Sequence, residues 1–315
     1  MRYKKNGLDL GGSSMKDIRG YIMEPQNFSV NDGDGIRTNI FFAGCPLRCS
    51  WCSNPESHTI SNKIAYYKKT CVNCKKCVDI CENDVGIDLN DKSNRIKCNS
   101  CGKCSEICPT KSRKNLIYKY SLKDIMKIIE KQKIFYDFSD GGVTFSGGEA
   151  TQQEEFLREL VNECYDKAID MAIETCAYFE FDKVKDILEK LDLIFVDIKH
   201  IDDDKHKQFT GVGNKKILGN ISKMNELKVP IVVRIPVIDG VNSDIENIRT
   251  TAKYIKGNVS NPKIELLPYH SFGDGKYEAL GLNIPSEKFK RPSLEDLEKL
   301  YEIIEKEGVE IVSYK

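Results

Sequence analysis

The sequence has no excess of either charge and no long hydrophobic run. Among its 315 residues, Lys plus Arg and Asp plus Glu both number 48, so the formal net charge is zero. A basic field that would attract nucleic acid or an anionic membrane is therefore not expected. No apolar stretch approaches the roughly 20 residues that a membrane-spanning helix needs. We expect neither a nucleic-acid-binding nor a membrane-spanning role.

The first twenty residues also lack the apolar core of a signal peptide. Basic residues open the chain, but no apolar run follows them. The Gly-Gly-Ser-Ser stretch at 11–14 is typical of a flexible lead, and Met15 is a candidate for the true start. We therefore expect a cytoplasmic protein, and we expect it to be monomeric.

Cysteine, in contrast, is abundant and unevenly distributed. Of the 13 cysteines, three lie between Cys45 and Cys52, eight lie between Cys71 and Cys108, and two stand alone. A long chain without an export signal is not a typical disulfide scaffold. Cysteines clustered at spacings of two or three residues favour metal binding.

Residues 60–115 contain an internal repeat and few large apolar side chains. The stretches CVNCKKCVDIC (71–81) and CNSCGKCSEIC (98–108) share the pattern C-x2-C-x2-C-x3-C, 27 residues apart. A segment this poor in apolar side chains cannot bury much of a core, so something other than packing must hold it together. We predict a small insert module, flanked by domain segments 1–59 and 116–315.

The repeated run matches the bacterial ferredoxin pattern for two [4Fe–4S] clusters, in which the fourth cysteine of each run binds the other cluster. One predicted set is Cys71, Cys74, Cys77 and Cys108, and the other is Cys81, Cys98, Cys101 and Cys104. Pro109 follows the second run as usual, whereas Glu82 follows the first. A pair of four-cysteine zinc sites is the alternative, but zinc sites favour two well-separated C-x2-C pairs.

The loop GCPLRCSWC (44–52) has only three cysteines, in the pattern Cys45-x3-Cys49-x2-Cys52. The two ferredoxin-like sets leave only Cys164 and Cys176 as further sulfur ligands. Both are more typical of small core residues, although Cys176 lies at a predicted strand end. We predict a three-thiolate iron–sulfur site with one open iron. A fourth ligand from Cys164 or Cys176 would instead indicate an electron carrier.

The remaining chain alternates between apolar, β-branched runs and helical stretches. Strands are predicted at 38–44, 142–147, 171–176, 193–199, 230–238, 263–269 and 309–314. Helices are predicted at 122–138, 154–168, 181–191 and 293–308, the last capped by Ser293 and closed by Gly308. Alternation of this kind favours a parallel sheet with helices outside. The predicted fold is α/β, a partial (β/α)6 barrel with the ferredoxin-like module inserted.

Polar groups follow the predicted strands, at the end where barrel enzymes carry their chemistry. They are the cysteine loop from Cys45, Gly147-Gly148-Glu149, Glu174-Thr175, Asp197-Ile198-Lys199, Arg234 and Tyr269-His270. We expect these groups to share one mouth of the barrel.

The cysteine loop, with Trp51 before its last cysteine, resembles that of the radical S-adenosylmethionine (SAM) superfamily. The resemblance implies a [4Fe–4S] cluster whose open iron is chelated by the amino and carboxyl groups of SAM. It also implies reductive cleavage of SAM to methionine and a 5'-deoxyadenosyl radical.

Further motifs, from about residue 19 onward, resemble one family, the glycyl-radical enzyme activating enzymes. They are DGDGIR (32–37, with Asp34 where the family has proline), SGGEA (146–150), DIKH (197–200), IPVIDGVN (235–242) and LLPYH (266–270). The resemblance makes Cys45, Cys49, Cys52 and Lys199 catalytic. It implies SAM contacts from Trp51, Cys52, Ser53, Gly147, Gly148, Glu149, Asp197, Ile198, Lys199, Arg234 and His270, and a monovalent-cation site near Glu174 and Thr175.

Each of these residues has a structural alternative. Gly147 and Gly148 fit a strand-to-helix turn, and Glu149 fits an acid at a helix N-terminus. Asp197 and Lys199 fit an ion pair at a strand end. Arg234 and His270 fit groups that are paired within the fold.

The resemblance implies an enzyme that abstracts hydrogen from a backbone glycine of a partner glycyl-radical enzyme, with electrons from reduced flavodoxin or ferredoxin. It does not identify the partner: hydroxyproline or glycerol dehydratase, choline lyase and arylacetate decarboxylase systems stay open. The alternatives are a sulfatase-maturing type enzyme, which usually carries its extra clusters late in the chain, an electron carrier, and a zinc-binding interaction protein.

Overall fold

The computed structural model describes residues 18–314. The expected lead at 11–14 and the candidate start at Met15 lie outside the described residues.

A single nine-stranded sheet forms the centre of the protein, in the order β11-β10-β9-β8-β7-β6-β2-β1-β5. Its strands are β1 (Arg19–Ser29), β2 (Arg37–Phe42), β5 (Tyr118–Ser121), β6 (Gly142–Gly147), β7 (Asp170–Thr175), β8 (Leu193–Asp197), β9 (Ile231–Val237), β10 (Lys263–Pro268) and β11 (Glu310–Ile311). From β2 to β11 neighbouring strands are parallel, while β1 is antiparallel to both β2 and β5. The prediction of a parallel α/β sheet is confirmed.

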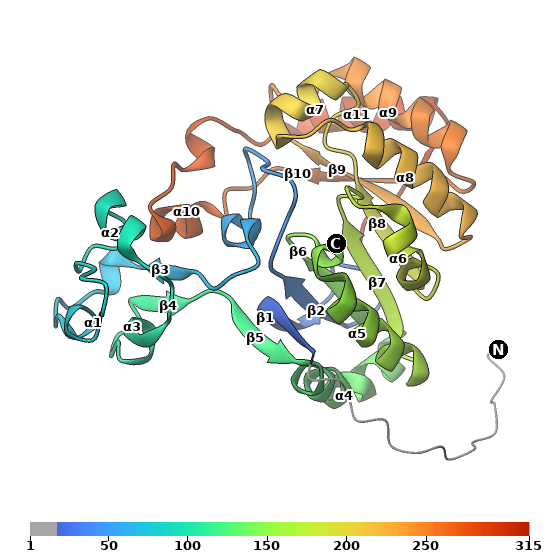
Figure 1. The fold of residues 1–315 in the computed structure, drawn as a ribbon. Helices are drawn as coiled ribbons and strands as arrows, with labels where there is room; N and C mark the ends of the chain where they lie inside the picture. The colour runs from blue at the N-terminus through green and yellow to red at the C-terminus, as the bar shows by residue number, and fades with distance from the viewer. Residues whose placement is uncertain (1–17, 315) are drawn as a thin grey trace, which may run out of the picture.

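From β2 to β11 the parallel strands follow one another across the sheet in the order of the chain, as in a barrel. The main helices are α4 (Leu122–Ser139), α5 (Glu154–Asp166), α6 (Phe181–Leu188), α7 (Asp203–Thr210), α8 (Lys215–Glu226), α9 (Ile245–Asn258), α10 (Asp274–Leu280) and α11 (Leu294–Lys306). Figure 1 shows α5, α6, α8, α9 and α11 along the outer side of the curved sheet. The carboxyl ends of the parallel strands therefore gather at one mouth.

Local capping explains where the predicted helices begin. Ser293 accepts a hydrogen bond from the Asp296 amide (3.1 Å), so it caps α11 as predicted, and Gly308 follows the helix with φ +74. Ser121 and Asp124 form a capping box at the start of α4. Both caps satisfy amide groups that a helix N-terminus leaves without intrahelical partners.

The two faces of the sheet differ in chemistry because alternate residues of a strand point to opposite sides. In β7, Met171 and Ile173 join the large core beneath the helices. Ala172 points the other way and packs with Phe195 and Val232 inside the barrel. Glu174 continues this inner register, so the strand itself carries a carboxylate toward the barrel interior.

The ferredoxin-like segment forms a separate small body on one side of the barrel, beside α10 (Figure 1). It contains a two-stranded antiparallel sheet of β3 (Ile64–Tyr66) and β4 (Arg113–Asn115), and the short helices α1 (Lys76–Asp79), α2 (Lys92–Lys97) and α3 (Lys103–Glu106). Its own buried cluster has only four residues: Ile64, Tyr66, Val85 and Leu89. The small core agrees with the expectation that packing alone does not hold this module together. The boundaries 1–59, 60–115 and 116–315 stay a prediction.

Some elements were not predicted. The strand β1 and its partner β5 extend the sheet beyond β2, and neither strand was predicted. The expected last strand at 309–314 forms only the two-residue β11. Helices α7 to α10 were also not predicted.

Candidate active site

The cysteine loop follows β2 at the mouth of the barrel, and other loops hold its backbone. Arg48 donates from Nη1 to the Cys45 carbonyl (2.6 Å) and from Nη2 to the His58 carbonyl (3.0 Å). The amide of Arg48 donates to the Thr210 carbonyl (2.7 Å), at the end of α7. The loop is thus tied to itself and to the segment after β8 before any cofactor is present.

Lys199 lies close enough to all three cysteines to interact with them electrostatically. Burial raises the pKa of Cys49 to about 12 and that of Cys52 to about 11, and Lys199 opposes both rises. Thiolate is the form that binds iron. The ammonium of Lys199, which is largely shielded from solvent, therefore offsets part of the cost of the negative charge that this loop must hold.

Cys176 lies against Cys45, so it is more than the small core residue that was expected. A hydrogen bond with the Cys176 thiol holds the pKa of Cys45 below its usual value. Cys176 is only 5% exposed and follows β7 directly. Its possible approach to the centre, considered from the sequence, is what the structure shows.

Cys164 has the core position that was expected. It lies in α5 with no exposed surface, and its sulfur is 4.0 Å from the Met126 sulfur. It belongs to the main core cluster, away from the cysteine loop.

Side chains have no room at Gly147, the last residue of β6, or at Gly148, the residue after it. Gly147 has φ +111, and a Cβ there would lie 2.4 Å from the backbone of Phe42. A Cβ on Gly148 would lie 2.4 Å from the Gly44 carbonyl oxygen. The Gly148 amide donates to the Phe42 carbonyl (2.9 Å) and the Glu149 amide to the Gly44 carbonyl (2.7 Å). Close approach to the cysteine loop therefore requires both glycines.

Glu149 is fully buried, and its carboxylate joins the ends of β6 and β7. It accepts hydrogen bonds from the Thr175 hydroxyl (2.9 Å), the Cys176 amide (2.8 Å) and the Thr151 hydroxyl (2.7 Å). The expectation that Glu149 only marks a helix N-terminus is thus too narrow. Its carboxylate supports the turn that carries Cys176.

Asp197 and Lys199 form the ion pair that the sequence suggested, with 2.8 Å between Nζ and Oδ2. Burial alone would lower the pKa of Lys199, but Asp197 and Cys49 outweigh it, so the pKa lies above its usual value. Ile198 between them is buried, and its amide donates to the Arg234 carbonyl (3.0 Å). The pair therefore places a permanent ammonium beside the cysteine loop.

The expected contacts at the rim differ in burial. Trp51 is 6% exposed and packs against Phe209 and Phe289, each with 5.9 Å between ring centroids. Ser53 is exposed. His270 is also exposed, and its ring lies 4.5 Å from that of Phe272. Trp51 thus anchors the loop, while His270 lies at the outer edge of the mouth.

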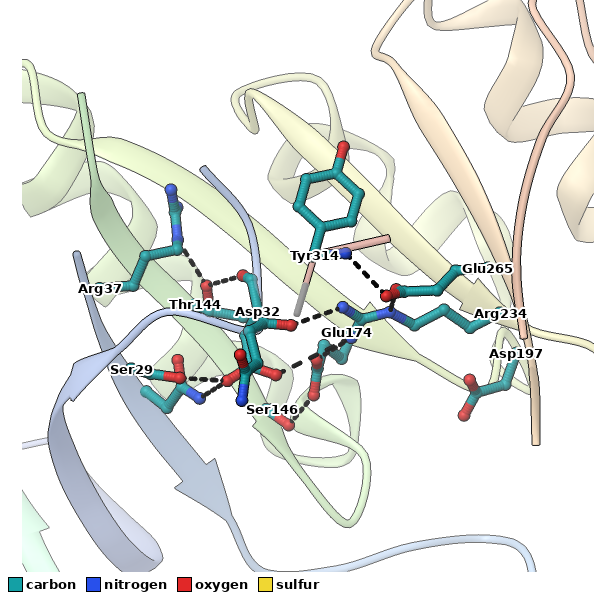
Figure 2. A network of polar contacts seen from close by, with 12 residues as sticks. Ser29, Asp32, Arg37, Thr144, Ser146, Glu174, Asp197, Arg234, Glu265 and Tyr314 are labelled. Carbon is teal, nitrogen blue, oxygen red and sulfur yellow. Dashed lines mark hydrogen bonds and ion pairs between the residues drawn. The ribbon is translucent and has the colours of Figure 1, made fainter. Parts of the chain in front are cut away.

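Arg234 lies inside the barrel at the centre of a polar network (Figure 2). Its Nε donates to Glu265 (2.7 Å), its Nη1 to Glu174, and its Nη2 to the Asn31 carbonyl (3.0 Å). The guanidinium carbon lies 3.7 Å from the centroid of the Phe195 ring. Arg234 is therefore heavily engaged within the fold, as its structural alternative predicted.

Ser146, Ser29 and Asp32 extend this network in Figure 2. Ser146 donates to Glu174, and Ser29 donates to Asp32 (2.5 Å). Burial raises the pKa of Glu174 to about 7; Arg234 opposes the rise, and the neighbouring Asp32 adds to it. The barrel interior thus holds one carboxyl group that titrates near neutral pH.

The DGDGIR motif is a fixed loop that reaches this network. Arg37 is 1% exposed and donates to the Thr144 hydroxyl (2.7 Å), the Val143 carbonyl (2.9 Å) and Asp170 (2.8 Å). Thr144 in turn donates to the Asp32 carbonyl (2.7 Å). Arg37 therefore has a structural role that positions Asp32.

The eight remaining cysteines line two separate hollows in the insert. One is lined by Cys71, Cys74, Cys77 and Cys108. The other is lined by Cys81, Cys98, Cys101 and Cys104, with Cys77 at its edge. Each hollow contains the four cysteines of one predicted set, and Cys77 lines both. The assignment of these cysteines as cluster ligands stays a prediction.

Two residues of α10 that were not predicted from the sequence support the cysteine loop. Lys276 donates to Asn54 (2.7 Å) and pairs with Glu56 (2.6 Å). The Tyr277 hydroxyl donates to the Cys52 carbonyl (2.9 Å). No sequence signal announced them, because these pairs are separated by more than 200 residues.

Among the described residues, no helix is both long and apolar enough to cross a membrane.

The sequence of this chain is similar to a known family model and to known proteins. A family model described as the Radical SAM superfamily matches residues 95–252. The trans-4-hydroxy-L-proline dehydratase activating enzyme of Clostridioides difficile is 38% identical over 90% of this chain and 95% of its own length. The 4-hydroxyphenylacetate decarboxylase activating enzyme of Clostridium scatologenes is 36% identical over 90% of this chain and 94% of its own length.

One solved structure supports the fold alone. Streptococcus suis SuiB bound to its precursor peptide SuiA matches 85% of this chain and 46% of that chain, with a TM-score of 0.50 and 15% identity. The family follows from the curated relatives, whose similarity spans nearly the whole chain. This chain is an enzyme that belongs to the glycyl-radical enzyme activating enzymes of the radical SAM superfamily.

Proposed function

We propose that the three thiols of Cys45, Cys49 and Cys52 hold a [4Fe–4S] cluster with one open iron, and that SAM binds there. The observation that carries this proposal is the separation of the cysteines. Eight line the two hollows of the insert, and three lie together at the barrel mouth beside Lys199. The complete protein would then carry three [4Fe–4S] clusters.

The residues present fit such a site. The loop supplies soft sulfur ligands, and Lys199 supplies positive charge beside them. Bound there, the cluster would supply the electron that cleaves SAM to methionine and a 5'-deoxyadenosyl radical. The chain itself binds and orients the cofactor and excludes water.

The residues of the mouth have separate parts in this proposal. Gly147 and Gly148 let a ligand approach the backbone, where a Cβ would already collide with Phe42 of β2 or with Gly44 of the cysteine loop. Lys199 and Asp197 present a fixed charge pair to the polar end of SAM. His270 lies at the exposed rim, where it can reach the cofactor only from the outside of the mouth. The cation site near Glu174 and Thr175 stays a proposal.

The substrate in this proposal is a backbone glycine of a partner glycyl-radical enzyme. The relatives are named as activating enzymes for different partners, including a dehydratase, a decarboxylase and a lyase. The partner of this chain is therefore proposed only as a class. We also propose that the enzyme is monomeric and works in an anaerobic cytoplasm.

The charge of the insert supports an acidic electron donor such as flavodoxin or ferredoxin. Residues 60–115 contain twelve Lys and Arg but six Asp and Glu, in a chain whose net charge is zero. Opposite charge steers the encounter of two proteins. The insert is thus the part of the molecule most suited to receive such a donor.

Electron paramagnetic resonance of a candidate partner tests the function. The iron-loaded protein, reduced anaerobically and given SAM, should generate a glycyl radical on its correct partner. Replacing the partner's radical glycine by alanine should remove the signal. A reduced protein that cleaves SAM but produces no radical on any dehydratase, lyase or decarboxylase partner would contradict the proposal.

The contact between Cys176 and Cys45 makes it necessary to test that Cys176 is not a fourth ligand of this cluster. The variant Cys176→Ala makes that test. An open-iron site keeps its iron and its SAM cleavage in this variant, since alanine removes no ligand. Loss of iron from the three-cysteine site in Cys176→Ala would contradict the open iron.

A further inference from the structure

Arg113 is a buried arginine placed between the two cysteine-lined hollows of the insert. It is 3% exposed and is the first residue of β4, opposite Tyr66 of β3. Its side chain lines both hollows. No other cationic side chain among the described residues is shared by both linings.

The guanidinium has no carboxylate partner within the described part of the chain. Its Nη2 donates to the Gly86 carbonyl (2.9 Å) and the Ile87 carbonyl (2.8 Å), while its Nε is buried without a hydrogen-bond partner. Its guanidinium carbon lies 5.0 Å from the centroid of the Tyr66 ring. A buried cation with only neutral partners is costly unless negative charge lies nearby.

The cysteine sulfurs can supply that negative charge. Arg113 lines the hollow of Cys71, Cys74, Cys77 and Cys108 and also the hollow of Cys81, Cys98, Cys101 and Cys104. The same positive charge therefore lies beside the sulfurs of both predicted sets.

We propose that the positive charge of Arg113, which lies between the two insert clusters, stabilises the reduced form of each cluster and so raises its reduction potential. The inference rests on the proposed function, which assigns a [4Fe–4S] cluster to each hollow. A thiolate-bound cluster carries net negative charge that grows by one unit on reduction. Net charge and hydrogen bonds to sulfur are two of the determinants of its reduction potential.

Arg113 differs from the lysines around it because its charge is buried and lasting. Lys103 also lines one hollow, but it is 47% exposed and pairs with Glu82 (2.5 Å). Water and salt screen such a charge, whereas they screen a buried one much less. Arginine also stays protonated across the accessible pH range, so the stabilisation should not vary with pH.

The test uses a full-length parent protein with Cys45, Cys49 and Cys52 all replaced by alanine, so that only the insert clusters contribute. Iron analysis of this parent should give about eight irons. Titration with dithionite and redox mediators, followed by electron paramagnetic resonance, then gives the midpoints. The variants are Arg113→Met, which removes the charge, and Arg113→Lys, which keeps it. Lys103→Met is the matched control at an exposed, paired charge.

In Arg113→Met, the reduction equilibrium constant of at least one cluster should fall about tenfold, which is about 59 mV for one electron. Arg113→Lys should keep most of the wild-type value, and Lys103→Met should change it less than threefold. If Arg113→Met takes up less iron, Arg113→Gln is judged by the same criterion, because it keeps an amide donor for the two carbonyls.

Two failures are distinguishable. An iron-loaded Met or Gln variant with the midpoints of the parent would overturn the role of Arg113 alone. A parent that holds no iron would overturn the assignment of clusters to the insert, and the present inference with it.

Discussion

Gly148 occupies the point where the end of β6 meets the cysteine loop, and a side chain there has no room. In Gly148→Ala the new Cβ would lie 2.4 Å from the Gly44 carbonyl oxygen. Such overpacking costs on the order of 1–3 kcal/mol and should displace the loop. We expect less iron at the three-cysteine site, measured in a protein whose insert cysteines are intact.

Gly219→Ala is the matched control for this prediction. Nothing lies within 4 Å of a Cβ at Gly219, which is in α8. The control should keep its iron and gain up to about 1 kcal/mol of stability, because alanine favours the helix. Equal iron contents in the two variants would contradict the steric account of Gly148.

Glu174 should make stability depend on pH. Burial raises its pKa to about 7 in the folded protein, from an ordinary value of 4.5. Between these two values the folded state binds more protons than the unfolded state, so this contribution to stability is lost as the pH rises. The urea midpoint of the wild type should therefore be lower at pH 7.5 than at pH 5. In Glu174→Gln, which cannot titrate at this position, the two midpoints should lie closer together. A variant with the same pH dependence as the wild type would assign that dependence to other groups.

At the scale of elements, the motifs at strand ends were predictable and the partners that fix them were not. The strand at 142–147 matches β6 residue for residue, because its apolar run ends cleanly at Gly147-Gly148. The strand β1 escaped because bulges between Ile22 and Glu24 and between Gln26 and Ser29 break its alternation. Arg234 was expected at the cofactor, yet its carboxylate and carbonyl partners lie up to 203 residues away and gave no signal.

The last helix offers a test of the capping argument. Ser293 accepts a hydrogen bond from the Asp296 amide at the start of α11. Ser293→Ala should lower the free energy of unfolding by about 1 kcal/mol. Glu298→Ala, at an exposed position within the same helix, should have a smaller effect. Thermal unfolding of both variants measures the difference, and a larger loss in Glu298→Ala would refute the cap.

At the scale of the molecule, the fold places the candidate active site and the insert cysteines in two different parts. The barrel brings strand ends from residues 42 to 268 to one mouth, while the insert keeps eight cysteines in a body with a small core. The two cysteine sets could be proposed from the repeat and its spacing alone, because ligand exchange belongs to the sequence pattern itself. The contact of Cys176 with Cys45 and the burial of Arg113 between the hollows depend on folding, and no local pattern indicated them.

The positive charge of the insert should make electron uptake depend on ionic strength. Lys75 and Lys76 are exposed and border the hollow of Cys71, Cys74, Cys77 and Cys108. Replacing both by glutamine should slow reduction by an acidic donor roughly threefold to tenfold at low salt, and the difference should fade as salt is added. Stopped-flow reduction measures it. The matched control replaces Lys127 and Lys131, exposed on α4, and an equal effect there would deny a specific role to the insert.

The most direct measurement for the central claim is SAM cleavage by the iron-loaded, anaerobically reduced protein. The account predicts methionine and 5'-deoxyadenosine from the wild type and from Cys164→Ala, whose cysteine lies in the core. It predicts neither product from Cys49→Ala, which removes a proposed ligand of the open-iron site. Products from Cys49→Ala at the wild-type level, or none from a fully loaded wild type, would contradict it.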